Sequence, residues 1–216
     1  MAHRGVLFLD ELPEFRKHVL EVLRQPLEEA QVTISRSLVS LNYPAAVTLI
    51  ASMNPCPCGH LGDPKHECRC APAQVAAYQA RISGPLLDRI DLHIEVPSLR
   101  YRDLKEGSPG ESSEVIRARV QEARDLQRGR LKEHGLHCNA QMGPQQLREY
   151  CAIDDAGHDL LEAVVDRLGM SARAYDRILK VARTIADLER SARIEAQHVA
   201  EAIQYRLLDR QSRAAA

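Results

Sequence analysis

The chain has 216 residues and a formal net charge of −1, and hydrophobic residues make up 44% of it. Such a length allows one large domain or two small ones with real cores, which excludes a chain disordered in bulk. The near-neutral charge excludes a uniformly basic protein, so any contact with nucleic acid must come from a local cluster. No run of 18 apolar residues and no signal peptide is present. We therefore expect a cytoplasmic protein with no membrane partner.

The segment Gly5–Glu11 predicts a strand that carries acidic groups to the edge of a sheet. Its apolar run ends abruptly at Asp10 and Glu11, which is typical of a buried parallel strand. Ligands of open α/β sheets bind at the carboxyl edge. In nucleoside triphosphatases the first such carboxylate holds Mg²⁺ and the second polarises the attacking water. A core strand followed by a solvated turn is the alternative interpretation.

A helix and a β-hairpin are predicted next along the chain. From Glu14 to Leu23 the apolar residues recur at helical spacing, and Pro26 is expected to stop the helix. Gln31–Arg36 alternates with period two, and Leu41–Tyr43 does so again after a short turn. This pattern predicts a β-hairpin with Arg36 near its tip.

Two further strands and a helix are predicted before the sequence becomes wholly helical. The apolar run Ala46–Met53 ends at Asn54, much as the first run ended at Asp10. The two strands therefore present polar groups at equivalent ends. A helix is predicted over Pro72–Arg81, and Leu92–Val96 has the pattern of another strand.

The rest of the sequence predicts a linker followed by helices. Residues 101–113 are rich in glycine, serine, proline and charge, which is typical of a linker. Beyond them, apolar stripes at helical spacing predict four amphipathic helices, enough for a small bundle. We therefore expect residues 1–100 to form an α/β domain and residues 114–216 an all-α domain.

The chain has six cysteines, and these do not predict disulfides because the expected compartment is reducing. Four of them form two close pairs on a turn-rich loop: Cys56, Cys58, Cys68 and Cys70. Four thiolates on such a loop can close a tetrahedral, structural Zn²⁺ site. His60 and His66 are substitute ligands if one cysteine points away. Four free thiols are the alternative, because C-x-C gives a tighter bite than C-x-x-C.

Five motifs, taken in order, carry a resemblance to a known family. They are GVLFLDE, VTISR, ASMNP, SGPLLDRID and SARAYDRILKVARTIADLE, and they span nearly the whole chain. In this order they resemble the AAA+ ATPases of the magnesium-chelatase subunit I family. More closely, they resemble its competence-associated branch, which is linked to DNA helicase and branch-migration activity. The resemblance implies an α/β fold, namely the C-terminal half of a P-loop AAA+ αβα core, followed by an all-α lid domain.

The resemblance also implies roles for individual residues in ATP hydrolysis. Asp10 would hold Mg²⁺, Glu11 would orient the attacking water, and Asn54 would sense the γ-phosphate. Arg89 matches the arginine finger that reaches into an adjacent subunit's site, and Arg173 matches the second sensor at the start of a lid helix. The implied partners are further copies of the chain in a homo-oligomeric ring, expected to be a hexamer.

Ordinary structural roles stay open for several of these residues. Arg89 is flanked by aspartates and can be a surface ion-pair residue. Arg173 can be an ordinary charged residue in the first turn of a helix, and Asn54 can be a residue that only stabilises a turn. In the family the hairpin projects into a central channel, which implies that Arg36 contacts DNA phosphates. A solvated arginine is the alternative.

One part of the family pattern is absent from the sequence. No G-x-x-x-x-G-K-[ST] phosphate-binding loop occurs, so we expect the chain alone to bind ATP weakly and to need its own N-terminal region or a parent chain. The strand in Gly5–Glu11 is then expected to expose an apolar edge and face. The expected function is the C-terminal portion of an ATP-driven motor on DNA. A magnesium-chelatase-type ATPase subunit and a non-catalytic, truncated zinc-binding or interaction protein are the alternatives.

Overall fold

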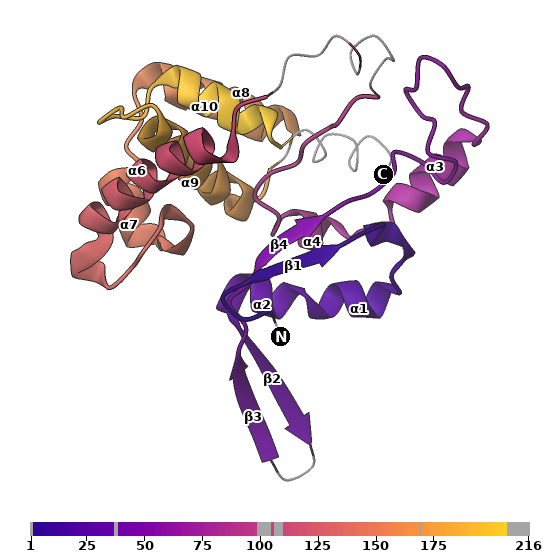
Figure 1. Ribbon diagram of the computed structural model, residues 1–216, viewed down its shortest axis with the longest axis horizontal. Coiled ribbons are helices and arrows are strands. Elements are labelled where there is room, and N and C mark those ends of the chain that lie inside the picture. The colour runs from indigo at the N-terminus through magenta and orange to yellow at the C-terminus, as the bar shows by residue number, and fades with distance from the viewer. Residues whose placement is uncertain (1, 37–38, 99–104, 106–109, 169, 207–216) are drawn as a thin grey trace. The chain divides into compact units, whose positions relative to one another are not determined.

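The computed structural model describes residues 2–36, 39–98, 105, 110–168 and 170–206. They mix helices with strands and form two compact units, residues 2–90 and residues 91–206 (Figure 1). Most of the predicted linker and residues 207–216 of the expected lid lie outside the described part. Among the described helices, none is both long enough and apolar enough to cross a membrane.

A parallel pair of strands lies at the centre of the first unit. β1 (Val6–Leu9) pairs with β4 (Thr48–Ala51) in a register that sets Leu9 opposite Ala51. This pairing confirms that the two predicted strands end at the same edge. Side chains alternate between the two faces, so Leu9 packs against the core while Phe8 is 59% exposed. The expected exposure of an apolar sheet face is therefore confirmed.

Two short helices follow β1 where one was expected. A 3₁₀ turn, η1 (Leu12–Glu14), leads to α1 (Lys17–Val22) and then to α2 (Arg24–Glu29). The prediction that Pro26 stops the helix is wrong, because this proline lies in the first turn of α2. In that turn the N–H that proline lacks has no intrahelical partner. Within the described ranges the buried apolar core of this unit is small: Leu12, Leu20, Ile82, Leu86 and Leu87.

The predicted hairpin is confirmed, and it extends away from β1 and β4 (Figure 1). β2 (Gln31–Arg36) and β3 (Val39–Pro44) pair antiparallel, and β3 begins earlier than expected. The side chain of Gln25 joins α2 to β2. Its Nε2 donates to Thr33 Oγ1 over 3.2 Å, and its Oε1 accepts the Thr33 N–H over 3.3 Å. The hairpin is therefore fastened to the helix that precedes it.

Two more helices complete the first unit. α3 (Pro72–Gln79) confirms the helix predicted over Pro72–Arg81, although it ends slightly sooner. α4 (Gly84–Leu87) begins after Ser83, whose hydroxyl accepts the N–H of Leu86 over 3.3 Å. A serine in this position satisfies a backbone donor that the helix itself leaves unpaired.

The strand predicted over Leu92–Val96 is not formed. Residues 92–98 adopt no regular structure, and the apolar side chains of Leu92, Ile94 and Val96 are exposed. An alternating pattern becomes a strand only where a neighbouring strand can pair with it. In the described residues, both sheets pair other segments, and this one joins neither of them.

The second unit is helical, as the sequence predicts. Its four long helices are α6 (Ser113–Leu131), α8 (Asp155–Leu168), α9 (Ala172–Leu188) and α10 (Ala196–Gln204). A shorter helix, α7 (Pro144–Tyr150), is one that the sequence pattern does not reveal. The apolar faces of α8, α9 and α10 meet in one core, which has 14 buried side chains among the described residues. α6 joins this core through Leu131, whereas its predicted stripe does not, because Ile116, Val120 and Leu126 are exposed.

A buried carboxylate joins three parts of this helical unit. Asp187 in α9 is only 1% exposed. Its Oδ2 accepts from Arg130 of α6 over 3.0 Å and from the Asn139 amide over 2.8 Å. Its Oδ1 accepts from Arg183 Nε over 3.1 Å. Because each buried charge is paired, the network adds specificity to the packing of α6 on α9.

Candidate acidic sheet edge and cysteine cluster

The carboxylate of Asp10 is held at the carboxyl edge of the β1–β4 sheet. Its Oδ1 accepts the N–H of Glu11 over 3.1 Å and the hydroxyl of Ser52, the residue after β4. The backbone N–H of Leu12 donates to Ser52 O over 2.8 Å, and the N–H of Ser52 donates to Leu9 O over 2.9 Å. These contacts fix one carboxylate oxygen of Asp10 and close the end of the sheet.

Glu11 adopts a backbone conformation that residues other than glycine rarely take. Its φ is 51° and its ψ is 49°, in the left-handed region, and the residue is exposed. That conformation costs about 1–2 kcal/mol for a residue with a Cβ atom. It turns the chain sharply from β1 into η1, so Glu11 stays at the sheet edge beside Asp10.

Asn54 lies at the same edge because β1 and β4 run parallel and it follows β4 shortly after Ser52. The backbone at this point is anchored by α3. The backbone N–H of Asn54 donates to the Tyr78 phenol oxygen, and Gln79 Nε2 donates to Pro55 O over 3.2 Å. Burial raises the pKa of Tyr78, so its phenol stays protonated. The main chain is thus fixed while the Asn54 residue remains exposed.

Arg89 is buried and paired within its own unit. It is 7% exposed, its Nε donates to Glu28 Oε2 over 3.0 Å, and its Nη2 donates to the same oxygen. Its Nη1 donates to Pro85 O over 2.7 Å. The structure therefore places this residue in a buried ion pair with Glu28 of α2.

Arg173 and Arg36 lie on the helical unit and on the hairpin, respectively. Ser171 caps α9 by accepting the N–H of Ala174 over 3.2 Å, so the exposed Arg173 lies in the first turn of that helix. Arg36 is the last residue of β2, opposite Val39, and its side chain lies outside the described part of the chain.

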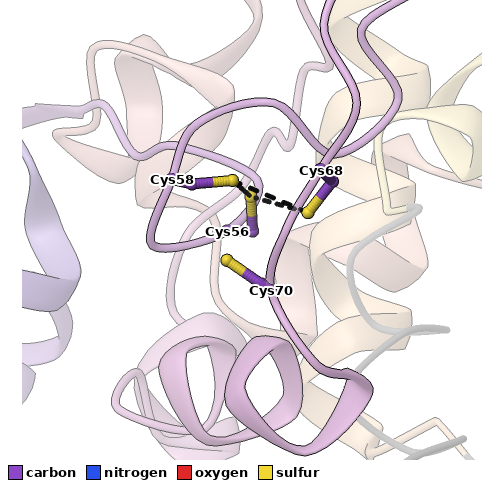
Figure 2. A group of neighbouring side chains, drawn as sticks. All are labelled: Cys56, Cys58, Cys68 and Cys70. Carbon is purple, nitrogen blue, oxygen red and sulfur yellow. Dashed lines mark hydrogen bonds between the residues drawn. The ribbon is translucent and has the colours of Figure 1, made fainter.

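The four cysteine side chains of the loop converge on one point (Figure 2). Cys56 Sγ lies 3.4 Å from Cys58 Sγ and 3.6 Å from Cys68 Sγ, and the latter two sulfurs are also 3.6 Å apart. All four sulfurs, including that of Cys70, lie within 4.8 Å of one another. Sulfurs placed 2.3 Å from a tetrahedral zinc ion would be about 3.8 Å apart. The cluster is therefore close to the geometry of a tetrahedral thiolate site.

The backbone of the loop favours a thiolate in this cluster. The Gly59 N–H donates to Cys56 O over 3.0 Å, which closes a turn and brings the first sulfur pair together. The N–H groups of His60 and Arg69 lower the pKa of Cys58 to about 6. A thiolate that is already stabilised is the form that binds a metal ion.

Comparison with protein families assigns both parts of the sequence. Residues 1–104 match the family described as magnesium chelatase, subunit ChlI, and residues 110–206 match its C-terminal family. The chain belongs to the magnesium-chelatase subunit I family. The resemblance inferred from the five motifs is thereby confirmed.

Individual relatives of this magnesium-chelatase family chain include bacterial and plant proteins. The uncharacterized protein YifB of Escherichia coli and the competence protein ComM of Haemophilus influenzae are each 44% identical over 211 residues, 97% of this chain. The chloroplastic subunit ChlI-1 of Arabidopsis thaliana is 27% identical over 104 residues, 48% of this chain and 19% of the relative. The chain spans 40% of the length of YifB and of ComM.

Two residues that contact the predicted site residues were not predicted from the sequence. Ser52 contacts Asp10, and its only sequence signal is its position one residue past the strand end, as Asp10 is in β1. Glu28 binds Arg89 from 61 residues away, and no local pattern marks it. Together with the predicted residues, Ser52 gives the sheet edge a carboxylate, a hydroxyl and an amide, which are hard oxygen donors suited to Mg²⁺ and its waters.

Proposed function

We propose that this chain is the C-terminal portion of a ring-forming AAA+ ATPase, a cytoplasmic motor that acts on DNA in recombination or natural transformation. The observation that carries the proposal is the acidic sheet edge. Parallel neighbours β1 and β4 bring Asp10, Glu11 and Asn54 to one carboxyl edge, where open α/β sheets bind their ligands. Their order matches what phosphoryl transfer needs from these positions.

The residues at this edge suit the Mg²⁺ that accompanies ATP. One oxygen of Asp10 accepts from Ser52 and from the Glu11 N–H, which orients the carboxylate while its other oxygen is available to the ion or its waters. Bound there, Mg²⁺ would neutralise charge on the phosphate oxygens. Glu11 orients the water, and Asn54 donates a hydrogen bond towards the γ-phosphate position.

Arg89 is proposed as the arginine finger for the ATP site of an adjacent copy in a hexameric ring. In the single chain its guanidinium is satisfied by Glu28 and Pro85 O. To act in trans, it exchanges the Glu28 carboxylate for phosphoryl oxygens, which a guanidinium binds in the same forked geometry. Arg173, exposed at the start of α9, is proposed as the second sensor on an AAA+ lid.

The proposed DNA contact is the β2–β3 hairpin with Arg36 at the end of β2. The hairpin extends away from the sheet, as an element that reaches into a channel must. The printed name of the relative ComM links that protein to competence. A single arginine per copy, repeated around a ring, would contact phosphates without reading base sequence.

The cysteine cluster is proposed to hold a structural Zn²⁺. Four sulfurs within 4.8 Å of one another form a closed donor set. Such a set has no open position for catalysis, so the ion would order the loop between β4 and α3.

Two other functions have specific support. The family match favours a magnesium-chelatase-type ATPase subunit, because both matching family models are described as magnesium chelatase, subunit ChlI. The cysteine cluster favours a non-catalytic zinc-binding protein that caps a partner ring, since the cluster is complete within this chain while no phosphate-binding loop is present in its sequence.

ATP turnover separates these functions. The purified chain is expected to hydrolyse no ATP, because most phosphate contacts come from the absent loop. A fusion that joins the preceding segment of the Haemophilus relative to this chain is expected to hydrolyse ATP faster when single-stranded or branched DNA is added. In that fusion Glu11→Gln should retain ATP binding and abolish turnover, whereas equal loss of both would remove the role assigned to Glu11.

Mixed rings test the role of Arg89. Arg89→Ala and Asp10→Asn fusions are each expected to be inactive, because each lacks a different half of a shared site. Mixed rings should regain part of the activity. Mixed assembly without any recovery would contradict action in trans. Activity that responds to a porphyrin and ignores DNA would favour the chelatase alternative.

A further inference from the structure

The loop that carries the cysteines also carries a second group of metal-binding side chains. Donor atoms of His60, Asp63 and His66 all lie within 4.8 Å of one another. They form a group separate from the four sulfurs, and the ATPase proposed above has no use for them. We propose that these three residues form a second metal site, which takes a borderline divalent ion such as Zn²⁺ through nitrogen and oxygen ligands.

Two turns in the backbone bring the three residues together. The Asp63 N–H donates to His60 O over 3.1 Å, which closes a turn through Gly62. Gly62 has a φ of 81°, a conformation open to glycine and strained for other residues. The Lys65 N–H donates to Asp63 Oδ1 over 2.7 Å. That bond orients the carboxylate, so its other oxygen, Oδ2, faces the histidines.

The distances around Asp63 Oδ2 fit a shared ion. His66 Nδ1 lies 3.2 Å and His60 Nδ1 lies 3.7 Å from this oxygen. Ligands placed 2.1 Å from a tetrahedral zinc ion are about 3.4 Å apart, between the two observed values. The imidazole rings lie side by side, with centroids 5.0 Å apart. Small side-chain rotations would therefore complete the coordination.

Hydrogen bonding accounts for only one of the two imidazole contacts, since His66 Nδ1 is hydrogen-bonded to Asp63 Oδ2 over 3.2 Å. The His60 Nδ1 to Asp63 Oδ2 separation of 3.7 Å is too long for a hydrogen bond, although both rings turn the same nitrogen towards one oxygen. An ion uses all three donors at once, whereas a proton joins only one ring to the carboxylate. The side chains of His60 and His66 are 44% and 63% exposed, so an ion can enter from solvent.

Three protein ligands leave at least one position of a tetrahedral ion open. Four cysteines would close their own site completely, so the two proposed sites differ in kind: the protein saturates the first and leaves a position open in the second. A water molecule or a donor from a bound partner would take the open position. The inference stands apart from the proposed ATPase, because metal binding can be measured on the chain itself.

Zinc titration of the reduced, metal-free chain tests the proposal. The unchanged chain is expected to bind two equivalents by isothermal titration calorimetry. X-ray absorption should find sulfur ligands near 2.3 Å for the first equivalent and added nitrogen or oxygen ligands near 2.0–2.2 Å for the second. The double variant His60→Asn/His66→Asn should bind one equivalent, with sulfur ligands only. The matched control His137→Asn/His158→Asn alters two exposed histidines elsewhere and should keep two.

Three results would overturn the proposal. A single equivalent in the unchanged chain would show that the three residues hold no ion. Loss of both equivalents from the His60→Asn/His66→Asn variant would assign these histidines to one shared site with the cysteines. Equal loss of the second equivalent from that variant and from the control would mean scattered surface binding.

Discussion

The two units of the chain differ in how many apolar side chains they bury. The helical unit buries 14 apolar side chains in one described core and adds the paired Asp187 network. The first unit buries five in its main cluster and leaves Phe8 and Ile50 of its sheet 59% and 49% exposed. Because apolar burial dominates the folding free energy, the unit that carries the acidic edge is the less self-sufficient one. The acidic sheet edge and the larger buried core thus lie in different units of the chain.

The largest expected effect comes from breaking the charge network of the helical unit. Asp187→Ala leaves the buried guanidinium of Arg183 and the half-buried one of Arg130 without their carboxylate. Removal of one partner from such a network costs about 3–5 kcal/mol. Urea denaturation followed by far-ultraviolet circular dichroism measures this loss. The control Asp125→Ala removes an exposed pair with Arg128 and should cost less than about 1 kcal/mol; equal costs would contradict a buried network.

A second prediction separates the cores of the two units. Leu161→Ala opens a cavity in the helical core and Leu20→Ala opens one in the core of the first unit, each costing about 2–5 kcal/mol. Since the cores are distinct, each variant should lower the resistance of its own unit to proteolysis during thermal unfolding. Mass spectrometry of the fragments assigns the unit. A single transition that both variants shift equally would refute this independence.

Removal of metal should affect the first unit alone. We expect a chelator, or Cys58→Ser/Cys68→Ser, to make the loop from Cys56 to Cys70 sensitive to protease, because ligands on a loop with glycines and prolines are disordered without the ion. The helices of residues 113–204 should stay resistant. Zinc analysis and limited proteolysis measure both effects, and Cys138→Ser is the control. Protein that contains no zinc and takes none up would contradict the expectation.

The smallest expected effect is a pH dependence confined to the helical unit. Burial raises the pKa of Cys151 from 9.0 to about 11, so the folded state keeps a proton that the unfolded state releases. The stability that this thiol contributes is therefore present below about pH 9 and is lost as the pH rises towards 11. From pH 8 to pH 10.5, the urea midpoint of the unchanged chain should fall further than that of Cys151→Ala. Equal falls of the midpoint in both proteins would show that Cys151 does not cause the pH dependence.

Much of the fold and part of the candidate site could be predicted because their signals are local. An apolar run that ends in Asp10 and Glu11 indicates a strand and its carboxyl edge, and the parallel pairing of β1 with β4 agrees. The cysteine spacing predicted a cluster, and the four sulfurs do converge. The amphipathic stripes predicted the long helices of the second unit, since a period of 3.6 residues needs no distant partner to be recognised.

The features that the sequence did not predict depend mostly on contacts between distant residues. The Ser52 hydroxyl reaches Asp10 across 42 residues, and Glu28 reaches Arg89 across 61. The alternating segment at 92–96 pairs with no strand in the described residues, and pairing is what its pattern alone cannot decide. Pro26 was misjudged for a different reason: its effect depends on whether a helix begins just before it, which propensity alone does not decide.

Helix α2 contacts both the hairpin and Arg89. Through Gln25 this helix is bonded to Thr33 of β2, and through Glu28 it holds the guanidinium of Arg89. Should a load on the hairpin tilt α2, the free energy of releasing Arg89 from Glu28 would change. By reciprocity, release of Arg89 changes the free energy of moving the hairpin by the same amount. In the proposed ring, DNA binding by the hairpin of one copy and insertion of its Arg89 into the neighbouring site would then share one coupling free energy.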